Sequence, residues 1–260
     1  MKKRIFSVVL FIVTLFSFVA CSGGGDGSSG SEKNDGSDMP KGYYDTAVLG
    51  DSLTDKGVYK ELVTVHYTDY LYEHCPFIEN IQNVGYAGSC IAGLSDKQGK
   101  TSPSFIERYS KIKKDVNLII VFGGTNDYGI GSSTLPNPLG EYGDDNAATF
   151  YGGLKTLIDG LEKNYPAAKL VFVTPIYRKE QEITGIPNKN KYGFTLEDYV
   201  SAIKETCEKR GVSCIDAFSG LSEINADTYE EYEIDGLHLN DEGNLLLGKY
   251  LAAELAKILD

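Results

Sequence analysis

The sequence predicts an α/β fold with a parallel sheet, and two observations lead to this prediction. Val116–Phe122 and Leu170–Val173 are nearly continuous runs of apolar and β-branched residues, as in strands that a parallel sheet buries on both faces. Between them, apolar residues from Ala147 to Leu161 recur every three or four positions, which is typical of a helix with one buried face. Strand and helix patterns alternate along the chain, which indicates layers of helices on a sheet.

The other elements follow from the same two patterns, taken in chain order. Strands are expected near Asp45–Leu49, Ile81–Val84, Val116–Phe122, Leu170–Val173 and Val212–Ile215. Helices are expected near Val58–His74, Ser102–Ile112, Ala147–Leu161, Thr195–Lys209 and Asn240–Leu259. Two long connections, Asp127–Asp144 and Ile176–Phe194, leave the same edge of the sheet, and we expect them to shape a binding pocket.

The first 40 residues differ in character from the rest of the chain. A basic head, Met1–Arg4, precedes the uncharged apolar stretch Ile5–Ala20, which is typical of an export signal and too short for a confident membrane span. Small residues before Cys21 resemble a bacterial lipobox, whose cysteine is lipidated; an ordinary cleaved signal is the alternative. We therefore expect a lipoprotein signal peptide over residues 1–20, a lipidated Cys21 opening a Gly/Ser/Asp-rich flexible tether over 21–40, and one folded domain over 41–260.

Charge and cysteine content narrow the possible partners. The chain carries 25 basic and 37 acidic residues, a net charge of −12, which argues against binding to nucleic acid. An exported chain allows disulfides; Cys207–Cys214 is the more plausible pair and Cys75–Cys90 the weaker one, with buried thiols as the alternative. No Cys-x-x-Cys pair is present and the histidines are scattered, so no metal site is expected.

Lipidation predicts an exported lipoprotein held at a membrane, on the periplasmic or surface face of an outer membrane.

Four short blocks carry the candidate chemistry. Gly50–Leu53 (GDSL) leaves the first strand, and Ser52 at this corner is a candidate nucleophile, although Gly-Asp-Ser also forms ordinary turns. Asn83–Gly88 (NVGYAG) and Gly123–Asp127 (GGTND) follow the second and third strands, and Asp235–His238 (DGLH) precedes the last helix. Because active sites of parallel sheets gather at the carboxyl ends of the strands, we expect all four blocks at one edge.

In this order, the blocks resemble the GDSL, or SGNH, family of serine esterases and acyl hydrolases. The resemblance covers Tyr44–Asp260 and implies a three-layer, flavodoxin-like fold with a central five-stranded parallel sheet. A serine hydroxyl needs a base to take its proton, and His238 is the histidine placed to do so. Asp235, three residues earlier, can orient the ring and offset its charge. The expected catalytic residues are therefore Ser52, Asp235 and His238.

The resemblance also supplies an oxyanion hole, formed by the backbone N–H groups of Ser52 and Gly88 and the side-chain amide of Asn126. Gly85 competes with Gly88, but the family places the donor glycine five residues after the asparagine, at Gly88. Glycine suits close approach of the backbone, and an amide donates a hydrogen bond without adding charge.

Four further residues are expected to support the site. Asp51 would bond loop amides near the site, and Asp127 would hold the loop after the third strand in the same way. Asn83 would hold the Gly88 loop by side-chain bonds, and Gly124 would let the chain turn before Asn126. The sequence departs from the family at two positions. Leu239 stands where a proline is usual, and Ser89 stands where many members carry aspartate.

These residues imply a serine hydrolase that cleaves esters through an acyl-serine intermediate without metal or organic cofactor. The expected substrate is a short-chain ester, most simply an acetyl ester, of a carbohydrate. That carbohydrate can be a small molecule or a polysaccharide. A lipase, lysophospholipase or thioesterase acting on longer acyl chains is the alternative within the same class. A non-catalytic glycan-binding surface lipoprotein is the alternative from another class.

Overall fold

The computed structural model describes residues 43–93, 102–129, 136–179 and 188–259. The expected signal peptide, the lipid-bearing Cys21 and the tether all lie outside these residues, so the lipoprotein and its location stay predictions. Parts of both long loops also lie outside the described residues. Within the described ranges, no helix is long and apolar enough to cross a membrane.

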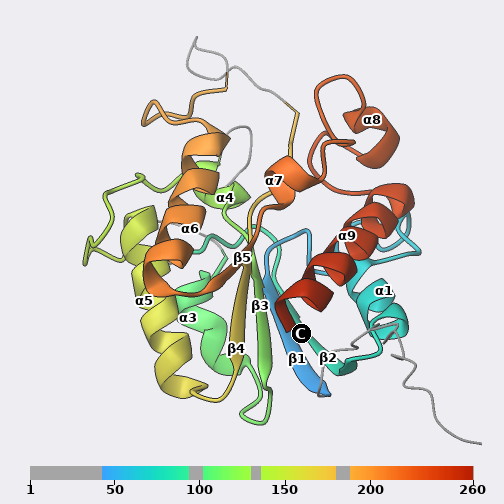
Figure 1. Ribbon diagram of the computed structural model, residues 1–260. Helices are drawn as coiled ribbons and strands as arrows, with labels where there is room; N and C mark the ends of the chain where they lie inside the picture. The colour runs from blue at the N-terminus through green and yellow to red at the C-terminus, as the bar shows by residue number, and fades with distance from the viewer. Residues whose placement is uncertain (1–42, 94–101, 130–135, 180–187, 260) are drawn as a thin grey trace, which may run out of the picture. The chain divides into compact units, whose positions relative to one another are not determined.

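Five parallel strands form one sheet, in agreement with the expected α/β fold (Figure 1). They are β1 (Tyr44–Gly50), β2 (Ile78–Gly85), β3 (Leu118–Phe122), β4 (Lys169–Val173) and β5 (Ser213–Ile215). Their order in the sheet is β2-β1-β3-β4-β5, and all neighbouring strands run parallel. This is the flavodoxin-like order, whose ligand sites lie where β1 and β3 meet and the winding reverses.

Helices cover both faces of the sheet. The longer ones are α1 (Tyr67–His74), α5 (Phe150–Asn164), α6 (Leu196–Arg210) and α9 (Asp241–Leu259). The short ones are α3 (Phe105–Arg108), the 3₁₀ turn η1 (Tyr109–Lys111), α4 (Thr125–Tyr128), α7 (Ala217–Gly220) and α8 (Tyr229–Tyr232). Together with the sheet, they make the three layers that the family resemblance implies.

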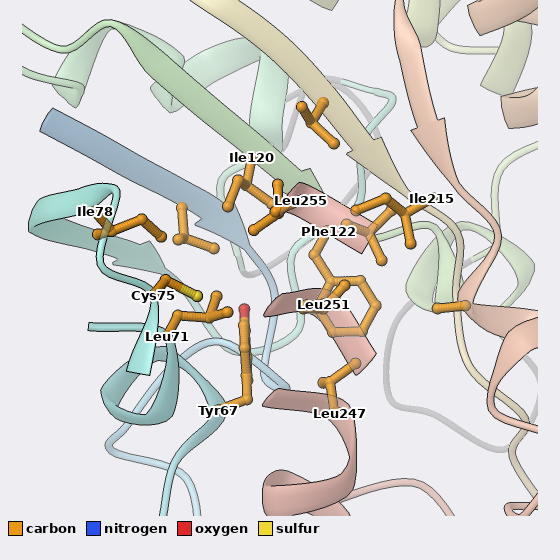
Figure 2. Close-up of a cluster of buried hydrophobic side chains, with 14 of the residues drawn as sticks. Tyr67, Leu71, Cys75, Ile78, Ile120, Phe122, Ile215, Leu247, Leu251 and Leu255 are labelled. Atoms are coloured by element: carbon orange, nitrogen blue, oxygen red, sulfur yellow. The ribbon is translucent and has the colours of Figure 1, made fainter. Parts of the chain in front are cut away.

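Alternating side chains of the central strand divide the core into two halves. Ile120 and Phe122 of β3 face α1 and α9, where Tyr67 and Leu251 pack against the sheet (Figure 2). The intervening residues of β3 belong instead to the core on the α5 and α6 side. Because successive side chains of a strand point to opposite faces, one apolar strand serves both layers and holds the carboxyl edge of the sheet in place.

Two expected helices are shorter than the sequence suggests. The Val58–His74 helix begins only at Tyr67. Thr64 and Val65 donate their backbone N–H groups to the Asp241 carboxylate, at 2.7 and 2.9 Å, instead of to a helical ladder. β-branched residues enter helices less readily, which favours the irregular path of this segment.

The expected Ser102–Ile112 helix is reduced to α3 and η1. Ser104 caps its start through a reciprocal bond with Glu107. The chain leaves the helical path at Arg108, whose φ of −126° and ψ of 0° end α3. At this position the Arg108 side chain is buried in the core, and its guanidinium bonds the Gly50 carbonyl at the edge of the sheet.

Neither expected cysteine pair is bonded in the structure. Cys75, Cys207 and Cys214 are thiols. Cys207, near the end of α6, and Cys214, in β5, lie close enough to affect each other's ionisation, as expected of neighbours. Their interaction raises the pKa of Cys207 and lowers the pKa of Cys214.

Candidate active site

The structure brings Ser52, His238 and Asp235 into one chain of hydrogen bonds. Ser52 Oγ lies 2.9 Å from His238 Nε2, and His238 Nδ1 lies 2.8 Å from Asp235 Oδ2. Although 186 positions separate serine from histidine, the ends of β1 and of the segment before α9 meet at the carboxyl edge of the sheet. With Asp235 ionised, Nδ1 carries the ring proton, and the Nε2 lone pair faces the serine hydroxyl.

Asp235 is fixed by its own turn. Its Oδ1 accepts the backbone N–H groups of Leu237, at 3.1 Å, and His238, at 2.9 Å. Gly236 has a φ of +83°, a conformation that only glycine adopts readily. Burial acts against the charged carboxylate, but hydrogen bonds from His238 and Tyr59 outweigh it and hold the pKa of Asp235 below its ordinary value.

Ser52 lies in a tight turn directly after β1. A Cβ on Gly50 would come within 1.9 Å of Thr54 Oγ1, so the turn requires glycine there. Asp51 bonds a loop amide near the site as expected, because its Oδ1 accepts the Leu53 N–H at 3.0 Å. The Asp51 carboxyl is buried rather than solvated, and burial raises its pKa to about 7.

The loop after β2 is tied to the serine loop on two sides. Asn83 donates from Nδ2 to the Thr54 carbonyl at 2.7 Å and accepts the Gly85 N–H at 2.9 Å, so it holds the loop as predicted. Asp55, which the sequence analysis missed, accepts the Ala87 N–H at 3.0 Å. Next along the chain is Gly88, whose φ of +72° requires a glycine-like conformation.

The Gly88 and Ser52 backbone amides have a further property in common. Within the ranges that the structure describes, neither N–H group donates a hydrogen bond to a protein acceptor. Backbone amides that have no protein acceptor are available as the donors that an oxyanion hole requires.

Asn126 and Asp127 connect the third block to the Gly88 loop. Asn126 is buried and donates from Nδ2 to the Ser89 carbonyl at 3.0 Å. Asp127 accepts the Ile91 and Ala92 N–H groups at 2.7 and 3.0 Å. Asp127 Oδ1 also accepts the side-chain N–H of Asn137, in the loop after the third strand, at 2.7 Å. Asp127 therefore holds the loop after the third strand, as expected, and the loop of the second block in addition. Gly124 turns the chain with a φ of +110°, as predicted.

Arg108 is a buried residue that the motifs did not reveal. Its guanidinium donates to the carbonyls of Val84 and Gly50 at the ends of β2 and β1, and to Ser89 Oγ at 2.9 Å. Burial lowers the pKa of Arg108 to about 10. Ser89, one of the two departures from the family, is thus a contact of this arginine. The departure at Ser89 was the signal in the sequence that the loop has a different support.

Leu239, the second departure, has a packing role. Its side chain is buried in the core beside α9, where the ring of a proline would fill less space. The next residue, Asn240, accepts the Gly243 N–H at 3.0 Å and so caps α9. The histidine loop is therefore anchored on its C-terminal side without proline.

Two more buried charged residues lie beneath the site. Arg178 donates to Thr125 Oγ1 at 3.2 Å, next to Asn126. Glu233 lies two positions before Asp235, and neither of its buried carboxyl oxygens has a hydrogen-bond partner. Burial, reinforced by the charge of Asp235, raises the pKa of Glu233 to about 8. No motif marked either residue.

Comparison with known proteins places this geometry in a family. The model of the GDSL-like lipase/acylhydrolase family matches residues 48–246. The match spans more than half of the chain and includes all four blocks, so the protein belongs to the GDSL-like lipase/acylhydrolase family. Family membership and fold together make it a hydrolase.

Solved structures share the fold along most of the chain. A protein from Lactobacillus plantarum is 30% identical, with a TM-score of 0.68, over 83% of this chain and 98% of its own. A possible lipase from Chitinophaga pinensis is 20% identical, with a TM-score of 0.61, over 82% and 98%. A mutant acetyl-xylooligosaccharide esterase from Geobacillus stearmophilus is 16% identical, with a TM-score of 0.57, over 84% and 96%. Among curated proteins, none matches the chain.

Proposed function

We propose that this protein is a serine hydrolase that cleaves carboxylic esters through an acyl-serine intermediate. The observation that carries the proposal is the 2.9 Å contact between Ser52 Oγ and His238 Nε2, continued at 2.8 Å to Asp235. In the mechanism, His238 takes the proton of Ser52 as the oxygen attacks the ester carbonyl, and then delivers that proton to the leaving alcohol. Water repeats the sequence on the acyl-serine, and Asp235 keeps the ring oriented throughout.

The oxyanion that forms during attack needs donors placed in advance. We assign this role to the backbone N–H groups of Ser52 and Gly88 and to the Asn126 amide. The open Ser52 and Gly88 amides, and the buried position of Asn126 against the Gly88 loop, support the assignment. In acyl transfer each such donor lowers the activation barrier by on the order of 3 kcal/mol, because fixed dipoles need no reorganisation during the reaction.

For the substrate, we propose a short acyl ester, acetyl, on a carbohydrate. The cavity of about 20 Å³ that adjoins Ser52 and His238 in the described structure is lined by neither Gly88 nor Asn126, so it does not measure the space for the acyl group. A small acyl group needs no deep channel. The likeness of the fold to an acetyl-xylooligosaccharide esterase is compatible with this choice, although fold alone does not define a substrate.

A lipase or thioesterase acting on longer acyl chains is the second candidate. One observation favours it: the loop between the serine turn and α1 exposes apolar side chains, including Leu62, which is 63% exposed. Exposed apolar groups beside a catalytic site can contact a lipid chain. A preference for octanoyl or palmitoyl esters over acetyl esters would support this candidate and contradict the first.

The test combines a covalent probe with a series of esters. Wild type should react with a fluorophosphonate at Ser52 and hydrolyse p-nitrophenyl acetate faster than the octanoyl and palmitoyl esters. Ser52→Ala should lose labelling and at least about 10³-fold in kcat, since the nucleophile is gone. Ser222→Ala, at an exposed serine, is the matched control and should behave as wild type.

The carbohydrate part is tested by acetate release from a panel of acetylated polysaccharides. Release by wild type and none by Ser52→Ala supports it. Failure of wild type to label and to turn over any ester contradicts the proposed function. Glycan binding under those conditions would indicate the non-catalytic binding protein instead.

A further inference from the structure

Tyr59 contacts both residues that would activate Ser52. Its hydroxyl donates a hydrogen bond to Asp235 Oδ2 at 2.9 Å, the same oxygen that His238 Nδ1 contacts at 2.8 Å. Its ring meets the His238 ring edge-on, with centroids 5.4 Å apart and planes inclined at 64°. One side chain therefore touches the carboxylate and the imidazole together, and no block of the family resemblance contains it.

The backbone at Tyr59 is in an unfavourable conformation. Its φ of +51° lies in the left-handed region, which residues with large side chains rarely adopt. The following residues hold it there, because the Leu62 and Val63 N–H groups donate to the Tyr59 carbonyl at 2.7 and 2.9 Å. Thr64 Oγ1 in turn donates to the Asp241 carboxylate at the start of α9. Strain that the surrounding structure maintains is common at functional sites.

Asp235 is more open to solvent than an orienting carboxylate usually is, since its side chain is 36% exposed. The turn holds Oδ1 through two backbone N–H groups, whereas water competes for Oδ2, the oxygen that faces the imidazole. A phenol in a fixed loop replaces that water with a hydrogen bond of defined direction. The remaining charged groups that act on Asp235 are Arg178 and Glu233, both from beneath the site.

We propose that Tyr59 is a positioning residue that fixes the Asp235 carboxylate against His238. This inference rests on the proposed function, because it assigns Asp235 and His238 their roles as orienting acid and base. The phenol shares the negative charge of Asp235 and gives Oδ2 a second, fixed partner beside the imidazole. Through Asp235 it controls the direction of the imidazole and the strength with which the protonated ring is held.

Removal of the hydroxyl alone has a predictable direction. In Tyr59→Phe, the carboxylate keeps its full charge for the protonated imidazole, so a higher pH is needed to release the base. The acid limb of the pH–kcat profile should move up by about half a pH unit. Oδ2 also loses one of its two protein partners, and kcat at the optimum should fall roughly threefold to tenfold, as for loss of one exposed charge-assisted bond. KM should not change, because the ring remains.

The experiment compares wild type, Tyr59→Phe and Tyr72→Phe, the last being an exposed tyrosine on α1. The profiles of p-nitrophenyl acetate hydrolysis and of fluorophosphonate labelling are recorded against pH. Tyr72→Phe should superimpose on wild type. A Tyr59→Phe profile that also superimposes on wild type overturns the proposal, and a raised KM with unchanged kcat replaces it with a substrate-contact role.

A second measurement needs no turnover. The Asp235 carboxylate raises the pKa of the Tyr59 phenol, and the difference in ultraviolet absorbance between wild type and Tyr59→Phe isolates this phenol among the 18 tyrosines. Its titration should move to lower pH in Asp235→Asn. If wild type has no esterase activity, the proposed function fails, and this titration still decides the Tyr59 contact. A phenol that Asp235→Asn does not shift overturns the proposal.

Discussion

The base half of the proposed site, Asp235 and His238, is held differently from the oxyanion half around Gly88 and Asn126. The base half relies on a short local turn and on contacts open to solvent. The oxyanion half rests on side chains buried between strand ends, with Arg108 only 1% exposed and Asp127 fully enclosed. Substitutions in the base half should therefore change chemistry with little effect on stability, and those in the oxyanion half should change stability first.

The largest expected effect is on activity, from Asp235→Asn. The amide removes the charge that offsets the protonated imidazole and favours the wrong ring tautomer. In the serine-protease template this substitution lowers kcat by about 10⁴; the greater exposure of Asp235 moderates the fall to about 10³. The free energy of unfolding should stay within about 1 kcal/mol of wild type.

Hydrolysis rates and urea denaturation of the same preparation check this prediction. Asp227→Asn, at an exposed carboxylate, is the control and should match wild type in both measurements. A loss of several kcal/mol in Asp235→Asn would show that the base half is as integral to the fold as the oxyanion half, and the comparison would fail.

The second largest effect is on stability, from Arg108→Met. Methionine fills similar volume, but it leaves the Val84 and Gly50 carbonyls and Ser89 Oγ without the donor that now serves them. Each buried acceptor that is left unsatisfied costs about 1–3 kcal/mol, so the loss over these acceptors should amount to several kcal/mol. Urea denaturation measures the loss of unfolding free energy.

The control is Arg210→Met, which removes surface ion pairs to Asp159 and Glu162. Pairs of this kind contribute about 1 kcal/mol or less. Equal losses of unfolding free energy in the two arginine variants would mean that the buried bonds of Arg108 stabilise the protein no more than surface ion pairs do. The proposed support of the oxyanion half would then be wrong.

The same division explains what the sequence could and could not predict. The meeting of Ser52, Asp235 and His238 could be predicted because the four blocks, taken together and in order, resemble a known family. The five-strand sheet was predictable because runs such as Val116–Phe122 are buried on both faces. The supports were not, since Arg108 acts across the fold on strand ends remote in sequence and looks like any other helical arginine.

The sequence also could not predict the path of the loop that carries Tyr59 in the base half. The pattern of the sequence predicted a helix here, but the Asp241 carboxylate takes the amides that a helix would use. Tertiary contacts of this kind override local preference. The contact between Tyr59 and Asp235 spans 176 positions, and no local pattern could have shown it.

The smallest expected effect concerns Glu233, the exception to the comparison, because it is a buried charged group beneath the base half. Its folded-state pKa, about 8, lies above the ordinary value of 4.5. The folded state therefore binds the proton more tightly than the unfolded state. The contribution of Glu233 to stability is present in full below about pH 4.5 and is lost as the pH rises through 8.

Glu233→Gln should remove this dependence. At about pH 4 the variant and wild type should unfold with nearly equal free energies, since the wild-type side chain is then largely neutral in both the folded and the unfolded state. At pH 9 the variant should be more stable by about 1–3 kcal/mol, because wild type then buries a carboxylate without hydrogen bonds beside Asp235. Comparison of variant with wild type cancels the contributions of other carboxylates. Urea denaturation at both pH values, with the exposed Glu223→Gln as control, measures the difference. Equal stability at pH 9 would mean that Glu233 gains hydrogen-bond partners or contact with water when it ionises. The interior next to the base half would then be accessible to solvent.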